Sequence, residues 1–386
     1  MDTHGRQLAA LSMYHALNDG SLAVFLAALP VMRIAIDLSL IQIGTLLSSG
    51  LLATVMMQFV FGYLSDRGHT RWTLVFGIVS LAIIDLMFVK AGNYWHVLMF
   101  YLLLRAVAGV YHPVSFSTIF RTAPNRSSAM GIQSAFGDGS LAFAMFSTGF
   151  IAESFGWQAP FLLWGLAALA GVITFLSLVD PRHDCAPSPD YSEFSVGRVT
   201  KGRITRRYVV VQMSTLFLQC LYLIFSGFMP LFLNVNLHLS PGVSALVVAL
   251  WLAIGIGSTF NAGRFVAFLG SEKRTLRICF GLTALMLISA TALLLRTQYW
   301  TAALVLLVLS GVAFFPTFPV VYGVIGTTAP RNRLGLAYAT NLSLSLIAGS
   351  AFSYLAGYLS SIFTLIVVLP ILIAAALATC VTGFLL

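Results

Sequence analysis

The chain has 386 residues, of which 59% are hydrophobic and only 9% are charged, and its mean hydropathy is +0.93. Soluble globular proteins carry about a quarter charged residues, so the composition excludes that class. The formal net charge of +9 could suggest a nucleic-acid-binding protein, but the positions of the basic residues, given below, argue against such a partner.

Apolar runs of about twenty residues or more recur along the whole chain, and each is long enough to cross the hydrocarbon core of a bilayer. We therefore predict an all-α membrane protein with twelve transmembrane helices. The first run shows no small-residue cleavage site, so we expect it to be retained as a helix. In chain order the helices are expected near residues 8–34, 39–64, 72–91, 95–120, 127–153, 158–179, 208–234, 242–267, 275–295, 299–326, 333–358 and 361–385.

With the N-terminus in the cytoplasm, the basic residues collect on cytoplasmic loops and ends, as the positive-inside rule describes. The exceptions among the 21 Lys and Arg residues are Arg33, Lys90 and Arg296 on the other side, and Arg105 and Arg264 within helices. The basic charge therefore reflects membrane topology. We expect a multi-pass protein of the cell inner membrane with both termini cytoplasmic, in contact with the lipid bilayer and without a nucleic-acid partner.

The longest polar stretch, residues 181–207, contains Pro, Ser and charges of both signs, a composition typical of a linker. It separates residues 1–180, an expected N-terminal six-helix bundle, from residues 208–386, an expected C-terminal six-helix bundle.

The two halves also resemble one another in sequence. Tyr-Trp pairs open a helix at 94–95 and at 299–300, and the segments RTAPNR (121–126) and TTAPRNR (327–333) end the same two helices. Because two matches occur at nearly the same offset and in the same order, we predict an internal duplication that gives two pseudo-symmetric six-helix bundles.

The loop after the second expected helix reads GYLSDRGHTRW and starts at Gly62. Its Gly-x-x-x-Asp-Arg turn, followed by a basic residue, resembles motif A of the major facilitator superfamily of transporters. His69 stands where the usual second glycine is expected, and a plain basic turn that obeys the positive-inside rule is the alternative. The resemblance implies that the glycine permits close helix approach, the aspartate caps or pairs with a helix end, and the arginines hold a cytoplasmic gate closed. The implied gating residues are Gly62, Asp66, Arg67 and Arg71.

The fourth and fifth expected helices carry further superfamily signals. Arg105 followed by Gly109 resembles motif B, in which an intramembrane arginine is tied to proton coupling. Motif C, a Gly-Pro signature of many antiporters, is absent from the sequence, since Ala144 and Met145 stand in its place.

Within the superfamily, three short motifs resemble the fosmidomycin-resistance-like branch. They are the His-x-x-Asn-Asp of helix one (His15, Asn18, Asp19), Tyr-His-Pro at 111–113 and Gln-Ser-x-Phe at 133–136. The resemblance implies export of a small compound such as an antibiotic. Val114 and Asp138 depart from the branch pattern, so the substrate is expected to have diverged.

Polar side chains inside the apolar helices need a reason, because a charge at the bilayer centre costs at least ~2.5–3.5 kcal/mol. The three polar residues of helix one stand at i, i+3 and i+4, so a helix places them on one face. We expect helices one, four and five to turn such faces toward a transport path in which Asp19 or Asp138 pairs with Arg105. A carboxylate that alternates between an apolar environment and a neighbouring cation binds and releases a proton. The proton-coupling candidates are Asp19, Asp138, His15 and His112.

Each intramembrane charge also has a structural alternative. Arg105 and an aspartate can form a static interhelical ion pair, and His112 can satisfy backbone groups freed by the proline that follows it. Asp85, toward the outer end of the third helix, can pair with Lys90 or extend to the interface. Arg264 can extend toward the cytoplasmic end of its helix.

The C-terminal half holds almost no buried charge apart from Arg264, and we expect it to offer the solute hydrogen bonds and an apolar wall. PTFP at 316–319 predicts a kink or break in the tenth helix, which suits a gate. The candidate substrate-binding residues of both halves are Asn18, Arg105, His112, Asp138, Gln219, Tyr222, Asn261, Arg264 and Asn341.

We therefore predict a proton-coupled secondary transporter of this superfamily that moves a small amphipathic, anionic or zwitterionic compound by alternating access, as an exporter. The alternative is a proton-coupled importer of an organic acid, an amino acid or a metal chelate. A sensor that binds the solute without moving it also fits the sequence. We expect no enzyme, because no activated nucleophile or metal-ligand set stands on neighbouring positions.

We further expect a monomer whose partners are the small-molecule substrate and protons, with no cofactor and no metal. The four cysteines are scattered and show no paired spacing, so the sequence predicts neither disulfides nor a metal cluster. They are Cys185, Cys220, Cys279 and Cys380.

Overall fold

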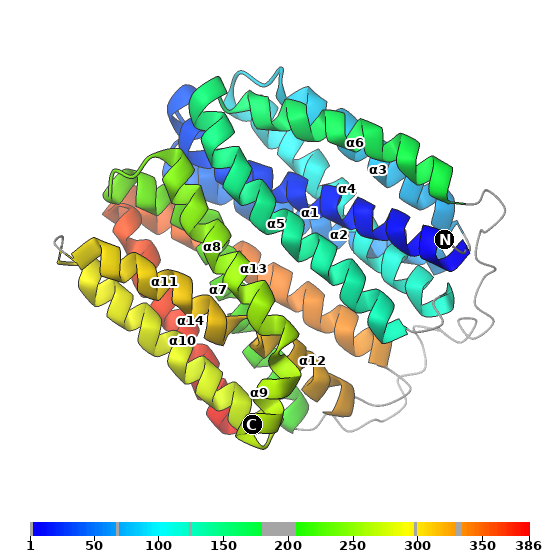
Figure 1. Cartoon of the computed structure of the whole chain (residues 1–386). Coiled ribbons are helices and arrows are strands. Elements are labelled where there is room, and N and C mark those ends of the chain that lie inside the picture. Colours follow the sequence, from blue (N-terminus) through cyan, green and yellow to red (C-terminus); the bar gives the residue numbers. More distant parts are fainter. Residues whose placement is uncertain (1–2, 67–68, 123–125, 180–205, 297–298, 329–333) are drawn as a thin grey trace. The chain divides into compact units, whose positions relative to one another are not determined.

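A computed structural model of the chain describes residues 3–66, 69–122, 126–179, 206–296, 299–328 and 334–386 (Figure 1). The described residues form 12 helices that are long and apolar enough to cross a membrane, and the expected all-α membrane fold is confirmed. The expected linker, 181–207, lies outside the described residues except for Arg206 and Arg207, which begin a helix. Arg67 of the expected gate lies outside them too.

The N-terminal half consists of six long helices, and their bounds lie close to the predicted ones. They are α1 (Thr3–Ala35), α2 (Leu40–Asp66), α3 (Thr70–Phe88), α4 (Tyr94–Thr122), α5 (Arg126–Phe155) and α6 (Gln158–Leu178).

The C-terminal half contains the six remaining spans, some of which are divided into shorter elements. Its elements are α7 (Arg206–Asn236), α8 (Pro241–Phe260), α9 (Ala262–Leu269), α10 (Glu272–Leu294), α11 (Trp300–Phe314), α12 (Thr317–Thr328), α13 (Leu334–Phe363), the short 3₁₀ helix η4 (Leu365–Val367) and α14 (Val368–Leu385).

Helix ends in the C-terminal half follow local sequence signals. Ser240 and Ser271 stand before α8 and α10, and each side-chain oxygen accepts a hydrogen bond from the backbone N–H three residues later. Gly270 ends α9 with φ of 84°, a left-handed conformation that costs glycine little. Thr364 separates α13 from η4 at φ of 75°, so the last span begins later than the predicted residue 361.

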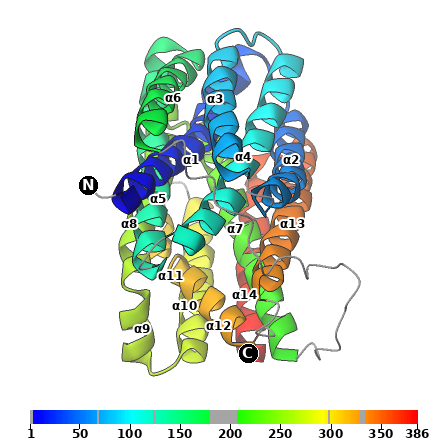
Figure 2. The same cartoon turned by 90° about the vertical axis from the view of Figure 1, so that its right-hand side faces the viewer.

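Two predicted helices are interrupted. The break predicted from PTFP is confirmed, because α11 ends at Phe314 and α12 begins at Thr317 (Figure 2). The eighth predicted helix, 242–267, was expected to be continuous, but Asn261 divides it into α8 and α9. The Asn261 side chain donates to the carbonyl of Gly257 at 2.9 Å, a bond within the last turn of α8.

The chain divides into two compact units, Met1–Leu38 with Ser49–Val199, and Ser39–Ser48 with Thr200–Leu386. In the first unit α1 packs against α3, α4, α5 and α6, and both views show it beside α5 (Figures 1 and 2). Small residues permit this packing: a Cβ on Gly171 of α6 would overlap Leu17 of α1. Polar groups on α1 therefore contact residues of α3, α4 and α5.

The second unit is built around α7, which packs against α8, α12, α13 and α14. An aromatic cluster fills the space where α7 and α8 meet the α11–α12 break. Trp251 stacks on Phe225 and Phe314, with ring centroids 4.2 and 5.2 Å apart, and its indole N–H donates to Ser310 at 3.2 Å. The cluster gives this unit an apolar interior next to the interrupted helix.

Candidate functional site

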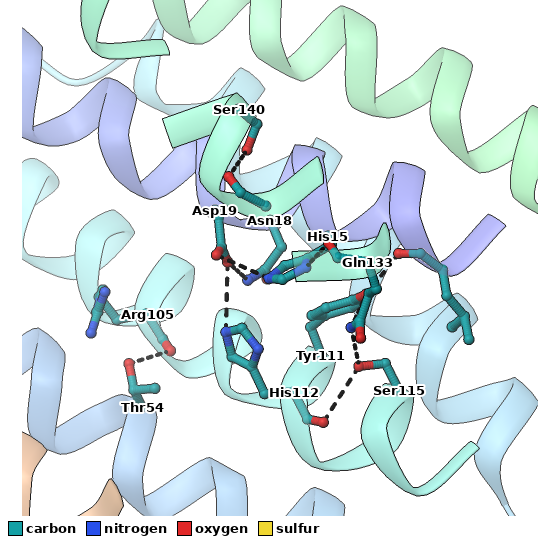
Figure 3. A network of polar contacts seen from close by, with 12 residues as sticks. His15, Asn18, Asp19, Thr54, Arg105, Tyr111, His112, Ser115, Gln133 and Ser140 are labelled. Carbon is teal, nitrogen blue, oxygen red and sulfur yellow. Dashed lines mark hydrogen bonds and ion pairs between the residues drawn. The ribbon is translucent and has the colours of Figure 1, made fainter. Parts of the chain in front are cut away.

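The centre of the polar cluster in the first unit is the carboxylate of Asp19. One carboxylate oxygen, Oδ2, lies 3.1 Å from Nε2 of His15 on the preceding turn of α1. The other, Oδ1, lies 3.6 Å from Nε2 of His112 on α4 and accepts a hydrogen bond of 2.8 Å from the amide of Asn18 (Figure 3). The three polar residues of α1 thus lie together, and Asp19 among them contacts α4.

These groups are partly to largely shielded from solvent. The side chains of His15, Asp19 and His112 retain 7%, 15% and 32% of their exposure. Asn18 is fully buried, and its Oδ1 has no hydrogen-bond partner among the described residues. His112 is therefore the most exposed of the three charged or titratable side chains in the cluster.

His15 is held from the opposite side by α5. Its Nδ1 lies 2.8 Å from the backbone carbonyl of Gln133, and a carbonyl can only accept a hydrogen bond. Nδ1 therefore carries a proton, and Nε2 is the atom that faces Asp19. The imidazole also stacks on the ring of Tyr111, with centroids 4.8 Å apart and planes inclined by 25°.

A second set of hydrogen bonds links α1, α4 and α5 below the imidazole. The Tyr111 hydroxyl donates to the carbonyl of Leu11 at 2.7 Å. The side-chain amide of Gln133 donates to that hydroxyl at 2.7 Å and to Ser115 at 3.2 Å (Figure 3). All of these side chains are buried, so the three helices are fixed to one another around His15.

The α5 backbone comes close to the imidazole at Gly137. A Cβ placed on Gly137 would stand 2.5 Å from Nε2 of His15, closer than real side chains come. Asp138 is the next residue and is half-buried, within electrostatic range of Asp19 and His15. It makes no hydrogen bond or ion pair within the described part of the chain.

Arg105 does not join the Asp19 cluster. Its guanidinium lies apart from Asp19 in Figure 3, and the expected ion pair with Asp19 or Asp138 is absent from the described residues. Instead its backbone carbonyl accepts a hydrogen bond of 2.9 Å from Thr54 on α2, and its Nε is buried without a partner there. The physical reason is that two histidines already flank Asp19, one of them a single helical turn away.

The comparisons with known proteins decide the family. The family model of the Major Facilitator Superfamily matches residues 11–353, most of the chain. The chain belongs to the major facilitator superfamily. The resemblance stated from motifs A and B is therefore confirmed.

Two curated relatives share shorter segments with this major facilitator protein. The fosmidomycin resistance protein of Escherichia coli (strain K12) is 31% identical over 108 residues, which make up 28% of this chain and 27% of that protein. The putative glycerol-3-phosphate transporter 5 of Arabidopsis thaliana is 27% identical over 154 residues, 37% of this chain and 30% of that protein. The matched part thus spans less than a third of either relative.

Solved transporter structures match over nearly the whole chain. A bacterial homologue of the human lysosomal transporter Spinster, inward-facing and occupied, aligns with a TM-score of 0.80 at 15% identity, covering 100% of this chain and 97% of that one. A D-xylose–proton symporter aligns with a TM-score of 0.81 at 16% identity, covering 99% and 97%. At these identities the matches establish a shared fold.

Asp85 lies apart from this cluster and does not behave as expected. It is fully buried on α3, and the hydroxyl of Ser21 on α1 donates to its Oδ2 at 2.6 Å. The expected pairing with Lys90 or extension to the interface is wrong, because Asp85 faces α1 while Lys90 is exposed. Its other oxygen, Oδ1, has no hydrogen-bond partner among the described residues.

The contacts of the motif A residues agree only in part with the roles that the motif implies. The nearest atom to a Cβ on Gly62 would be Cβ of Pro113 at 3.8 Å, an ordinary contact, so close approach does not require glycine there. The close approach of α2 and α4 lies instead at Gly109, where a Cβ would stand 2.8 Å from the Thr54 carbonyl oxygen. The guanidinium of Arg71 lies 5.6 Å from the ring of its neighbour Trp72, and the side chain of Asp66 is outside the described set.

The expected binding residues of the second unit lie on α7, on α13 and at the α8–α9 junction. Tyr222 joins the aromatic cluster, 6.0 Å from Trp251 between ring centroids. Asn341 is buried and donates to Gln212, whereas Gln219 is half-buried on α7.

The remaining pair of predicted residues lies at the α8–α9 junction. Arg264 is exposed there and donates to the side chain of Asn261 at 2.9 Å. This position fits the alternative in which the arginine extends toward the end of its helix.

Four residues of the site were not assigned by the sequence analysis. Tyr111 and Gln133 belong to the Tyr-His-Pro and Gln-Ser-x-Phe motifs, which were quoted only as a resemblance. Gly137 and Ser115 carry no signal of their own, because a glycine and a serine are common in packed helices. The motif residues themselves were the signal: they surround His15.

Proposed function

We propose that this major facilitator protein is a proton-coupled secondary transporter that exports a small amphipathic, anionic or zwitterionic compound by alternating access. The supporting observation is that His15 and His112, from two helices, flank the carboxylate of Asp19 inside an apolar bundle. Placing a charged group among apolar membrane helices costs free energy, and such groups mark ion and substrate paths.

The same geometry supports a role for the cluster in proton binding. Because Nδ1 of His15 donates to a carbonyl, a neutral imidazole would turn the lone pair of Nε2 toward the Asp19 carboxylate, 3.1 Å away. Two acceptor atoms at that distance need a proton or another cation between them. We assign proton coupling to Asp19 with His15, and secondary roles to His112 and Asp138.

For the solute we propose contacts from Asn18, Arg105, His112 and Asp138. The buried guanidinium Nε of Arg105 has no partner in the described chain, which leaves a donor for an anion. Within the second unit, the residues that we propose for solute hydrogen bonds and an aromatic wall are Gln219, Tyr222 and Asn341. Arg264 and Asn261 are left out of this set because Arg264 is exposed and is bonded to the half-buried Asn261.

The names of the two curated relatives support an anionic solute. One refers to fosmidomycin and the other to glycerol-3-phosphate, and both compounds carry a phosphorus acid group. We further propose an inner-membrane monomer with cytoplasmic termini, six-helix bundles at residues 1–180 and 208–386, and a gate that includes Gly62, Asp66, Arg67 and Arg71.

Transport in proteoliposomes tests the proposal. Wild-type protein should accumulate a labelled phosphonate or carboxylate against its gradient when a pH gradient is imposed, and should also catalyse counterflow without one. Asp19→Asn should lose accumulation at least tenfold while keeping counterflow. Asp37→Asn, at an exposed loop position where φ is 50°, is the matched control and should keep both. A protein that binds the compound without counterflow would be a sensor, which would contradict the proposal.

An importer is the second candidate function. The observation in its favour is that Ala144 and Met145, both buried, occupy the place of the antiporter motif. Uptake of the labelled compound into energised cells, faster than in cells lacking the protein, would favour import.

A further inference from the structure

Three side chains of the first unit place donor atoms around one point. His15 and Asp19 on α1 and His112 on α4 each offer one ligand atom, and these atoms lie within 4.8 Å of one another. Ligand atoms around a tetrahedral zinc ion lie about 3.3 Å apart, since Zn–N and Zn–O bonds are about 2.0–2.1 Å long. We propose that His15, Asp19 and His112 form a binding site for a divalent transition-metal ion of the zinc type.

Two of the separations in the site already lie near those of this ion, whereas the ligand atoms as a set lie within 4.8 Å of one another, so the widest separation must shorten on binding. His15 Nε2 and an Asp19 oxygen are 3.1 Å apart, and His112 Nε2 and the other Asp19 oxygen are 3.6 Å apart. Both separations lie close to the spacing of tetrahedral ligands. The more exposed His112 is the ligand that would adjust, because it is not held by stacking on Tyr111 or by a backbone carbonyl.

The orientation of His15 is that of a metal ligand. Metal-binding histidines usually donate one ring N–H to a carbonyl or carboxylate and coordinate through the other nitrogen. His15 does this with the carbonyl of Gln133, 2.8 Å from Nδ1, so that Nε2 is free to coordinate. Stacking on Tyr111 and the bare backbone of Gly137 keep the ring in this position.

The donor set selects the class of ion. Two imidazoles and one carboxylate suit Zn²⁺, Co²⁺ or Ni²⁺, whereas Mg²⁺ and Ca²⁺ prefer all-oxygen sites. Three protein ligands leave one coordination position for water or a solute oxygen. The ion would occupy the same place between Nε2 and the carboxylate that a proton occupies in the proposed function, but the ion site does not depend on transport.

Calorimetry on purified, chelator-treated protein tests the site. Titration with ZnCl₂ should show one high-affinity site per chain, and MgCl₂ should show none. His112→Ala should weaken zinc binding at least tenfold. His96→Ala removes an exposed histidine at the start of α4 and is the matched control, which should bind zinc as the wild type does. Equal loss in both variants, or no loss in His112→Ala, would overturn the proposal.

A cobalt spectrum separates coordination from a structural effect. Co²⁺ in the wild-type protein should give the visible absorption of a four-coordinate site. His112→Cys should retain binding and add a sulfur-to-cobalt charge-transfer band, because a thiolate coordinates in place of imidazole. Binding without that band would place the ion elsewhere and refute the site. Intact counterflow with no zinc or cobalt binding would refute the ion site alone and leave the transporter proposal standing.

Discussion

The imidazole of His15 lies directly against the backbone of Gly137, leaving no room for even a methyl group between α1 and α5. A Cβ at that position would stand 2.5 Å from Nε2, the atom that faces Asp19. The glycine therefore sets both the distance between the two helices and the direction of the imidazole.

The first prediction concerns this contact. Gly137→Ala should destabilise the protein by about 1–3 kcal/mol, because the added methyl displaces the imidazole or separates the helices. Gly139→Ala, on the same helix with no atom within 4 Å of a Cβ, should be neutral or stabilise by up to about 1 kcal/mol. Thermal unfolding in detergent measures both. Equal effects of the two substitutions would show that the His15 contact is not tight.

The second prediction separates two glycines between α2 and α4. Gly109→Ala should destabilise, since its methyl would meet the Thr54 carbonyl oxygen, 2.8 Å from the ideal Cβ position. Gly62→Ala should leave the melting temperature nearly unchanged, because the nearest atom is 3.8 Å away. If Gly62→Ala nevertheless reduces transport at normal stability, glycine acts there in gating and not in packing.

The third prediction concerns the buried hydrogen bond between Ser21 and Asp85. Ser21→Ala removes the only hydrogen-bond donor that reaches Asp85 in the described chain, and should cost about 1–3 kcal/mol. Ser177→Ala, at an exposed position of α6, is the control, with an expected change within about 0.5 kcal/mol. Asp85→Asn keeps an acceptor for the serine hydroxyl, so its stability should stay near the wild-type value. A large loss in Asp85→Asn would mean that the carboxyl group itself is required.

The fourth prediction concerns ligand charge. Phosphonates and carboxylates, fosmidomycin among them, should raise the melting temperature of the wild-type protein. Arg105→Ala should lower their affinity at least tenfold, because a charge-assisted hydrogen bond is worth about 1.5–3 kcal/mol. Arg264→Ala, at an exposed site, should not change it. Stabilisation by lipophilic cations instead would make Asp19 and Asp138 the binding groups and favour a multidrug exporter.

The sequence predicts the membrane helices well because hydrophobic length and loop charge are local properties. The face shared by His15 and Asp19 is equally local, since the two residues are one helical turn apart. The break at PTFP follows from proline, which cannot donate a backbone hydrogen bond. The interruption at Asn261 has no comparable signal, and it was missed.

Pairing between helices could not be read in the same way. Arg105 and His112 share a face of α4 about 10 Å apart, so either could have met Asp19. How far α1 is shifted along its axis relative to α4 determines that Asp19 contacts His112 and not Arg105. No pattern of residues in the sequence encodes that shift. Asp85 shows the related difficulty: α3 is apolar all round, so hydrophobicity does not reveal which side faces α1.

The hydrogen bond that orients His15 is made by the main chain of Gln133 and not by its side chain. Replacing residue 133 would therefore disturb Tyr111 and Ser115 while leaving the acceptor of His15 in place. Mutational tolerance around the site should be uneven for this reason. Residue 133 can vary without removing the carbonyl that accepts from the imidazole, whereas a single extra carbon at residue 137 would displace the ring itself.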